Sequence, residues 1–295
     1  MIDLCDPRTI RGLMSAHHIR PHKEYGQNFL TDAAVVERIA DAPELPPSAA
    51  VLEIGPGIGT LTRALAARYR RVVALELDSG LLPVLAHTLG DCGNVQVVQG
   101  DALKADLAAL LAPEFAAGPV GVCANLPYYI TTPILMRLLE SRLPFCSLTV
   151  MVQEEVADRL CAQPGSRTYG AVTVAVAYFG EAAKLFRVPA DRFLPAPKVH
   201  SAVVRIALRR QPLYRPRSEA LFFRTVRAAF GQRRKTLPNA LSAGFPELSR
   251  AQIQQAVSDI GQPLTVRGEC LGPAEFCALS DALFACLPPR GAGET

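Results

Sequence analysis

Short apolar runs alternate with longer amphipathic stretches over the first half of the chain. Runs rich in Val, Leu and Ala and bounded by Gly, Pro, Asn or Asp are typical of buried strands. We predict such strands at residues 50–55, 71–78, 94–102, 119–129 and 148–153. The segments between them repeat apolar residues every three or four positions, as helices do. Alternating strands and helices predict a parallel sheet with helices on both faces.

The pattern changes near residue 209. Two more strands are predicted at residues 183–189 and 201–208, and the stretch RRQPLYRPRS that follows them is basic and broken by proline. From Glu219 onward apolar residues recur every four positions, which predicts helices. The prediction is therefore an α/β domain over residues 1–208, opening with an arm at residues 1–25, and a smaller all-α domain over residues 209–295.

The composition favours a folded, cytoplasmic protein. Of the 295 residues, 49% are hydrophobic and 20% are charged, which excludes a disordered chain. The eight cysteines form no C-x-x-C pair, and the nearby His17, His18 and His22 have no accompanying ligand set, so we predict no metal site. The first 20 residues lack the apolar region of a signal peptide, and the longest apolar stretch is interrupted by Asn and Pro. We therefore predict neither secretion nor a membrane span.

Three groups that can bind a ligand follow three consecutive strands. The turn EIGPGIGT has glycines at 55, 57 and 59, which let a ligand approach the backbone, but its spacing departs from the G-x-G-x-x-G dinucleotide fingerprint. Glu76 ends the second strand, where a carboxylate can accept both hydroxyls of a ribose. Asp101 ends the third, where it can accept an adenine amino group. Because such strand ends meet at one edge of the sheet, the set resembles the S-adenosylmethionine site of a Rossmann-like methyltransferase.

The fourth strand ends in the turn NLPYYI, residues 125–130. This turn resembles the [N/D]-P-P-[Y/F] signature of enzymes that methylate amino nitrogens. The side-chain oxygen of Asn125 and the backbone carbonyl of Leu126 can accept the two N–H groups of an adenine amine and aim its lone pair at a methyl donor. Pro127 keeps the turn rigid, and Tyr128 can stack on a flipped base. Taken alone, the turn also fits a helix cap beside a core tyrosine; the cofactor set beside it favours catalysis.

Nine segments together resemble the small-subunit ribosomal RNA adenine dimethyltransferase family across nearly the whole chain. They are GQNFL (26–30), EIGPGIGTLT (53–62), ALELD (74–78), GDAL (100–103), NLPYYI (125–130), MVQEEVADRL (151–160), PGSRTYG (164–170), FLPAPKVHSAVVR (193–205) and AFGQRRKTL (229–237). The resemblance implies N6,N6-dimethylation of two adjacent adenines in a loop near the 3′ end of the small-subunit rRNA. The implied partner is that RNA or the 30S pre-ribosomal particle, and we predict a monomeric enzyme.

The resemblance also implies roles for particular residues. The predicted cofactor contacts are Asn28, Leu30, Gly55, Gly57, Glu76, Asp101 and Asn125. The predicted catalytic residues are Asn125, Leu126, Pro127 and Tyr128, with Phe193 similar to a second aromatic that closes on the other face of the target base. At Tyr129 the family usually has Asn or Gln, so the role of this position is left open.

Positive charge is concentrated in one part of the chain. Ten Lys and Arg and a single acid lie between Arg205 and Lys235, whereas the whole chain has a net charge of only +4. Such a run is often just a solvated helix face, but beside an adenine pocket it favours RNA binding. The predicted RNA-binding residues are Arg224, Arg227, Arg233, Arg234 and Lys235.

Two other functions compete with this prediction. Large-subunit rRNA adenine methyltransferases that confer macrolide resistance share the cofactor set and the N-x-P-[YF] turn, although the stretch QRRKTLPNAL favours the small-subunit family. The chain could also serve mainly as a ribosome-assembly factor, with methylation secondary or absent. DNA adenine methylation is disfavoured because those enzymes usually have two prolines in the turn.

Overall fold

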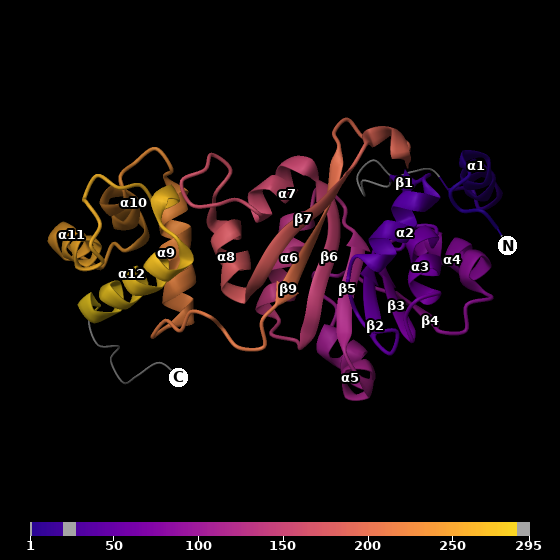
Figure 1. Ribbon diagram of the computed structural model, residues 1–295, viewed down its shortest axis with the longest axis horizontal. Coiled ribbons are helices and arrows are strands. Elements are labelled where there is room, and N and C mark those ends of the chain that lie inside the picture. The colour runs from indigo at the N-terminus through magenta and orange to yellow at the C-terminus, as the bar shows by residue number, and fades with distance from the viewer. Residues whose placement is uncertain (1, 20–27, 288–295) are drawn as a thin grey trace. The chain divides into compact units, whose positions relative to one another are not determined.

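The computed structural model describes residues 2–19 and 28–287 (Figure 1). His22 and residues 20–25 of the predicted arm therefore lie outside the described residues. The chain separates into two compact units, residues 1–158 with 180–210 and residues 159–179 with 211–295. The second unit thus includes residues 159–179, which we had assigned to the first domain.

The first unit is built on a seven-stranded sheet. Its order is β4 (Val95–Gln99), β3 (Arg71–Glu76), β2 (Ala50–Ile54), β5 (Val120–Asn125), β6 (Phe145–Gln153), β9 (Ser201–Leu208) and β7 (Gly180–Val188). The first five strands are parallel, as the strand–helix alternation predicted. β9 runs antiparallel to both of its neighbours, which the sequence pattern did not indicate.

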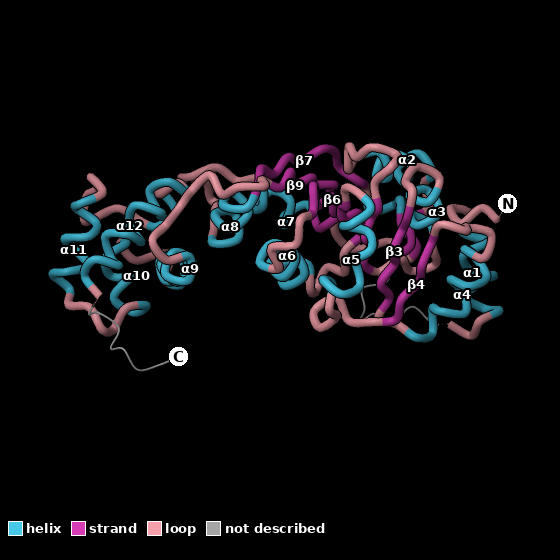
Figure 2. Tube along the Cα trace, turned by 90° about the horizontal axis from the view of Figure 1, so that it is seen from below, coloured by secondary structure: helices cyan, strands magenta, loops and turns pink. Residues whose placement is uncertain are grey.

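Helices lie on both faces of this sheet, with α2 and α3 on one face and α6 on the other (Figure 2). α2 (Ala33–Asp41) precedes the first parallel strand, and α7 (Glu154–Leu160) follows the last one. The helices between the parallel strands are α3 (Thr60–Ala66), α4 (Leu82–Leu89), α5 (Leu107–Ala117) and α6 (Thr131–Glu140). The side chain of Asp32 accepts a hydrogen bond from the Val35 N–H and so caps α2. The strand order reverses after β4, because the chain returns from this edge strand to place β5 beside β2, and the strand ends beside this reversal form the ligand-binding edge of such sheets.

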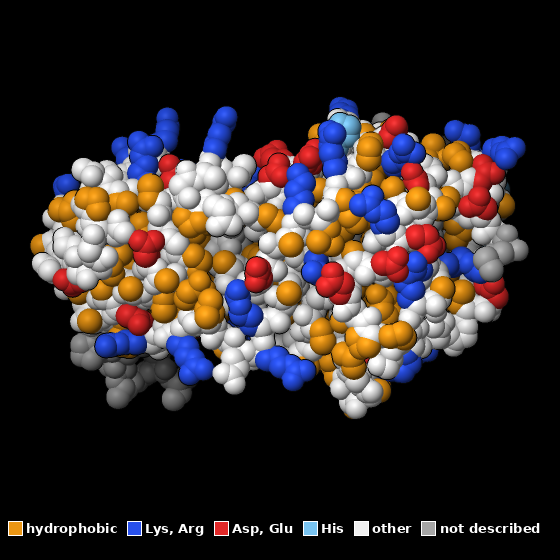
Figure 3. Space-filling view, viewed as in Figure 1, with side chains coloured by type: hydrophobic (Ala, Val, Ile, Leu, Met, Phe, Trp, Pro, Cys, Tyr) orange, Lys and Arg blue, Asp and Glu red, His pale blue; other side chains and the backbone are white. Residues whose placement is uncertain are grey.

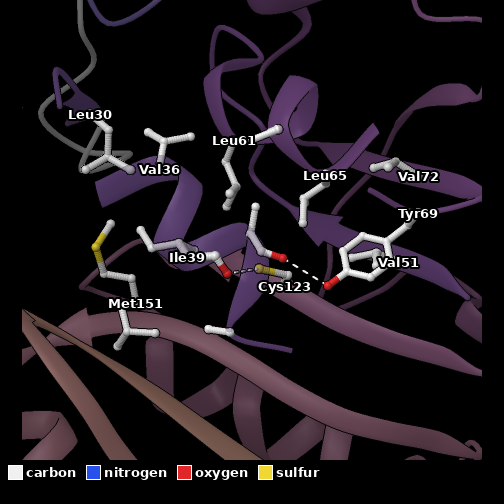
Figure 4. Close-up of a cluster of buried hydrophobic side chains, with 14 of the residues drawn as sticks. Leu30, Val36, Ile39, Val51, Leu61, Leu65, Tyr69, Val72, Cys123 and Met151 are labelled. Atoms are coloured by element: carbon white, nitrogen blue, oxygen red, sulfur yellow. Dashed lines mark hydrogen bonds between the residues drawn. The ribbon is translucent and has the colours of Figure 1, made fainter. Parts of the chain in front are cut away.

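The main core lies between the sheet and the helices α2 and α3. Val36, Ile39 and Leu65 pack there against strand residues of the sheet (Figure 4). The Tyr69 hydroxyl donates to the Ala40 carbonyl at 2.9 Å, and the buried Cys123 thiol donates to the carbonyl of Ile39. Polar atoms in this core thus have partners on α2, which fixes the helix over the strands.

The N-terminal residues form a helix where we had predicted only an arm. α1 spans Pro7–Ala16, with Asp6 as its N-cap, and its buried Ile10 and Leu13 belong to a second apolar cluster with Phe29, Ile58 and Leu81. Ile58 lies in the glycine turn, so α1 packs against that turn. The capped Asp-Pro start and the Ile10/Leu13 spacing were the local signals of this helix.

A short two-stranded sheet lies beside α1. β1 (Phe29–Leu30) pairs antiparallel with β8 (Phe193–Leu194). The N–H of Thr31 also donates to the Arg192 carbonyl at 2.9 Å. These bonds tie the segment that begins at Asn28 to a part of the chain some 160 positions later.

The second unit is helical, as predicted. It contains α8 (Ala171–Phe179), α9 (Glu219–Gly231), α10 (Leu237–Gly244), α11 (Arg250–Asp259) and α12 (Pro273–Cys286). The Tyr178 ring of α8 lies 4.9 Å from the Phe222 ring and 5.3 Å from the Phe223 ring, and the Tyr169 hydroxyl donates to the carbonyl of Leu271. These contacts explain why residues 159–179 belong to this unit.

Among the described residues, no helix is both long enough and apolar enough to cross a bilayer.

Candidate active site

One pocket of the first unit collects the carboxyl ends of β2, β3, β4 and β5. The structure brings together in its lining all seven residues that we predicted to contact the cofactor, namely Asn28, Leu30, Gly55, Gly57, Glu76, Asp101 and Asn125. Gly55 and Gly57 come from the turn after β2, and Glu76, Asp101 and Asn125 come from the ends of β3, β4 and β5. Leu30 belongs to β1, and Asn28 is the residue before that strand. Leu126, Pro127 and Tyr128 line the same pocket. Phe193 is not among the lining residues.

The glycine turn has the backbone that its sequence demands. Gly55 and Gly57 have φ values of 71° and 61°, in the left-handed region that favours glycine. A Cβ on Gly57 would lie 3.3 Å from Cε1 of Phe29, whereas a Cβ on Gly55 would meet no atom within 4 Å. The backbone at Gly55 therefore borders open space in the pocket, where a ligand can approach it closely.

Glu76 holds this turn in place. Its Oε2 accepts from the Gly57 N–H at 3.2 Å and its Oε1 accepts from the Asp78 N–H at 2.8 Å. The side chain is buried, and burial raises the pKa of its carboxyl, although the backbone hydrogen bonds oppose the shift. One carboxylate thus joins the glycine turn to the end of β3, and each oxygen retains a lone pair for a further donor.

Asp101 organises the turn that follows β4. Its Oδ1 accepts from the Leu103 N–H at 2.8 Å, and its Oδ2 lies 3.7 Å from the ammonium of Lys104. The backbone carbonyl of Asp101 also accepts from the N–H groups of Lys104 and Ala105, so the residue organises a tight turn. The predicted contact with an adenine amine would use an acceptor that this turn already fixes in direction.

Glu53, which we had not selected, is a buried carboxyl in the lining of the pocket. It is 1% exposed, and its Oε2 has no hydrogen-bond partner among the described residues. Burial raises the pKa of Glu53 to about 8, although the nearby Thr62 hydroxyl opposes the shift, and the carboxylate of Glu76 acts in the same direction as burial. An acid within the apolar run AVLEI was the sequence signal for it. An orphaned polar atom beside the open space at Gly55 fits a pocket that receives a polar ligand.

Asn125, the last residue of β5, lines the same pocket as the glycine turn. The Nδ2 of Asn125 donates to the Asn28 carbonyl at 3.4 Å, so the side-chain amide is oriented by the segment before β1. The N–H of Leu126 donates to the carbonyl of Met151, and the carbonyl of Pro127 accepts from the hydroxyl of Thr131 at 2.9 Å. These bonds fix the turn at both ends, between β6 and the start of α6.

The three aromatic residues considered for base binding differ in their surroundings. Tyr128 lines the pocket, and its hydroxyl lies 2.6 Å from the Ser201 hydroxyl on β9. Tyr129 also lines the pocket and is 52% exposed. Phe193 is 4% exposed and packs in the main core cluster, with its backbone paired to Leu30. The stacking role of Phe193 stays a prediction, and it would require the ring to leave this cluster.

The predicted RNA-binding cations divide into two groups. Arg224 pairs with Glu247 at 2.7 Å and donates to the Gly244 carbonyl, and Arg233 donates to the carbonyls of Arg167 and Tyr169. Both therefore hold the helical unit together. The other three, Arg227, Arg234 and Lys235, are exposed, and the ion pairs found among the described residues do not include them.

Basic and acidic side chains are interspersed on the face of the first unit that is visible in Figure 3. Examples are the contacts of Arg68 with Asp41 and of Lys184 with Asp158. The predicted RNA binding therefore depends on particular unpaired cations and not on the net charge of the chain.

The strand order and the chemistry of the pocket define the class of protein. The described lining contains carboxylates, amides and glycines and no Lys or Arg, which suits a ligand with a ribose and a base but no phosphate. These features are those of the S-adenosylmethionine-dependent methyltransferases of Rossmann-like fold. The chain belongs to the ribosomal RNA adenine dimethylase family, which it matches over residues 19–270.

Relatives and solved structures agree with this assignment. The ribosomal RNA small subunit methyltransferase A of Pelotomaculum thermopropionicum is 47% identical, over 96% of this chain and 98% of that protein. The protein of the same name from Shouchella clausii is 45% identical, over 97% of each chain. The crystal structure of the 23S rRNA methyltransferase ErmE has a TM-score of 0.68 at 28% identity, over 87% of this chain and 100% of that one. A dimethyladenosine transferase from Plasmodium falciparum has a TM-score of 0.66 at 25% identity, over 85% and 95%.

The raised pKa of Glu53 predicts a pH dependence of stability. Its ordinary value is 4.5, so between about pH 4.5 and 8 the folded protein keeps a proton that the unfolded chain releases. This contribution to stability is complete below pH 4.5 and is lost as pH rises through 8. Glu53→Gln should remove roughly 4 kcal/mol of the decline between pH 5 and 8.5, at about 1.4 kcal/mol per pKa unit.

Urea unfolding of both proteins at these two pH values measures the effect. Glu140→Gln, a change at an exposed acid on α6 of the same unit, is the matched control and should decline like the parent. Parallel declines of parent and Glu53→Gln would show that Glu53 is ionised in the folded protein.

Proposed function

We propose that the chain transfers methyl groups from S-adenosylmethionine to N6 of two adjacent adenosines in the loop of the 3′-terminal hairpin of small-subunit rRNA. The observation that carries this proposal is the position of Asn125. It lines the same pocket as Gly55, Glu76 and Asp101, and its Nδ2 is engaged by the Asn28 carbonyl. Its Oδ1 is then the atom that accepts an N–H of the target amine.

The pocket residues divide the binding of the cofactor between them. Glu76 accepts the ribose hydroxyls, Asp101 accepts the adenine amino group, and the backbone of Gly55 and Gly57 lies against the rest of the molecule. The open space at Gly55 and the unpartnered Oε2 of Glu53 support this fit. When bound, S-adenosylmethionine supplies a methyl group on a positively charged sulfur.

The turn at residues 125–128 positions the acceptor. The exocyclic amine of adenine is a weak nucleophile because its lone pair is delocalised into the ring. Oδ1 of Asn125 and the carbonyl of Leu126 accept its two N–H groups, which favours a pyramidal nitrogen whose lone pair points at the methyl group. The Tyr128 ring stacks on the flipped base. The turn needs no strong base, because the product loses its proton readily, and most of the rate comes from orientation.

The choice of RNA rests on the relatives. Curated proteins that are 45–47% identical over nearly their whole length are named for the small subunit, whereas the 23S enzyme ErmE is 28% identical. This difference in identity favours the small-subunit RNA as the substrate. The alternative substrate is 23S rRNA, for which ErmE is named. A 30S pre-ribosomal particle as substrate, a monomeric enzyme, a cytoplasmic location and a role in subunit assembly stay predictions.

Asn125→Ala tests the proposal. Unmodified small subunits and large-subunit RNA are incubated with labelled S-adenosylmethionine, and the nucleosides are then analysed. The parent should yield N6,N6-dimethyladenosine from small-subunit RNA alone. The variant should be slower by about 100-fold, roughly 3 kcal/mol, because it lacks a preorganised hydrogen bond to the reacting amine. Its cofactor affinity, measured by calorimetry, should change little.

Asn239→Ala, at an exposed position on α10, is the control and should match the parent. Product on large-subunit RNA would favour the ErmE-like activity. Parent-like rates for Asn125→Ala would refute the role of Asn125. Absence of methylation by a parent that still supports subunit maturation would favour the assembly factor.

The exposed cations of the second unit give a second prediction. Reversing the charge of Arg227, Arg234 and Lys235 should weaken RNA binding and lower the slope of log affinity against log salt by about 2, at roughly 0.7 for each lost phosphate contact with single-stranded RNA. Filter binding between 50 and 300 mM salt measures both. Arg250→Glu, at an exposed position on α11, is the control for charge alone. If the slope of log affinity against log salt were equal for the triple variant and the parent, these three residues would be solvated side chains that do not contact RNA.

A further inference from the structure

A hydrogen bond joins the turn that carries Tyr128 to a strand far along the chain. The Tyr128 hydroxyl and the Ser201 hydroxyl are 2.6 Å apart, across 73 positions of sequence. Ser201 is the first residue of β9 and is 0% exposed. It was not among the residues that the sequence indicated, because a lone serine at the start of a predicted strand has no distinguishing pattern.

The position of Ser201 is fixed from both sides. Its backbone pairs with Gln153 of β6 on one side and with Val188 of β7 on the other. Because both neighbouring strands hold the Ser201 backbone, the Ser201 hydroxyl cannot move with the Tyr128 side chain. The hydrogen bond therefore restrains the Tyr128 side chain. The tyrosine hydroxyl is thereby held at the sheet while the same side chain lines the pocket.

Tyr129 gives the contrast within the same turn. Its side chain is 52% exposed at the pocket, whereas Tyr128 is half-buried. Burial raises the pKa of the Tyr128 phenol, and the hydrogen bond with Ser201 opposes the shift. The phenol is therefore neutral at physiological pH, so either hydroxyl can donate in its bond with Ser201.

We propose that Ser201 is a positioning residue that locks the Tyr128 ring in the orientation in which it receives the target base. This inference rests on the proposed function and adds a residue to it. A stacking ring that is already fixed loses no rotamer freedom when the base arrives, which improves binding and alignment of the base. Ser201 itself touches neither cofactor nor base; it acts through Tyr128.

The test is a double-mutant cycle of Ser201→Ala and Tyr128→Phe. Each change removes one half of the hydrogen bond and keeps the ring. Each should lower kcat/KM for the RNA by about three- to tenfold, the range associated with immobilising one side chain, and leave the affinity for S-adenosylmethionine within twofold. The double variant should be no worse than either single one, because both remove the same bond.

Ser147→Ala is the matched control. Ser147 is also a buried serine of this sheet, 5% exposed on β6, and its hydroxyl donates to the carbonyl of Pro43 instead. A general effect of losing a buried hydroxyl would appear in this variant too. Equal losses in Ser147→Ala and Ser201→Ala, additive losses in the double variant, or parent-like kinetics of Ser201→Ala would each overturn the proposal.

A readout that needs no activity separates this inference from the proposed function. Protein labelled with 3-fluorotyrosine is studied by fluorine NMR, and the Tyr128 signal is assigned by its loss in Tyr128→Phe. In Ser201→Ala this signal should shift and narrow as the ring gains freedom, while Ser147→Ala leaves it unchanged. An unshifted signal would refute the restraint, whichever RNA the parent methylates.

Discussion

The site depends on the carboxylate of Glu76, which accepts the N–H groups of Gly57 and Asp78. The Gly55 N–H donates to the Leu75 carbonyl of β3 at 3.0 Å, and the bonds to Glu76 hold Gly57 as well, because a glycine backbone has no preferred direction of its own. With them, the turn leaves an open approach at Gly55, and the acid remains beside it as an acceptor. A single buried group thus determines both the shape of the cofactor pocket and part of its chemistry, and the acceptor turn at Asn125 is arranged around the same edge.

Much of this arrangement could be predicted because the strands could be recognised. The apolar runs placed Glu76, Asp101 and Asn125 at the ends of parallel strands, and parallel strands present those ends at one edge. The structure brings the three into one pocket. Local capping also follows short-range rules, because Asp32 stands directly before the apolar stripe of α2 and caps that helix. The rules for recognising strands and helix caps, together with the rule that parallel strands end at one edge of the sheet, were sufficient to predict these pocket residues and the cap.

The remaining features depend on partners distant in sequence. Ser201 reaches Tyr128 only because β9 is inserted antiparallel between β6 and β7, and the strand pattern gave no sign of that direction. Tyr178 draws residues 159–179 into the second unit through rings that lie beyond a proline-rich linker. Arg233 belongs to a basic run yet is bonded to two backbone carbonyls. No periodicity or composition could have separated it from its neighbour Arg234.

The most direct test of the account is a calorimetric titration of S-adenosylmethionine into the parent and into Glu76→Ala. A carboxylate that both shapes the turn and binds the ribose predicts at least a tenfold loss of affinity, about 1.4 kcal/mol or more. Hydrogen exchange in the same samples should show faster exchange of the Gly57 N–H, with the sheet still protected. Unchanged affinity in a variant whose turn has become mobile would contradict the account, because the pocket would then bind its cofactor without the group on which we say it depends.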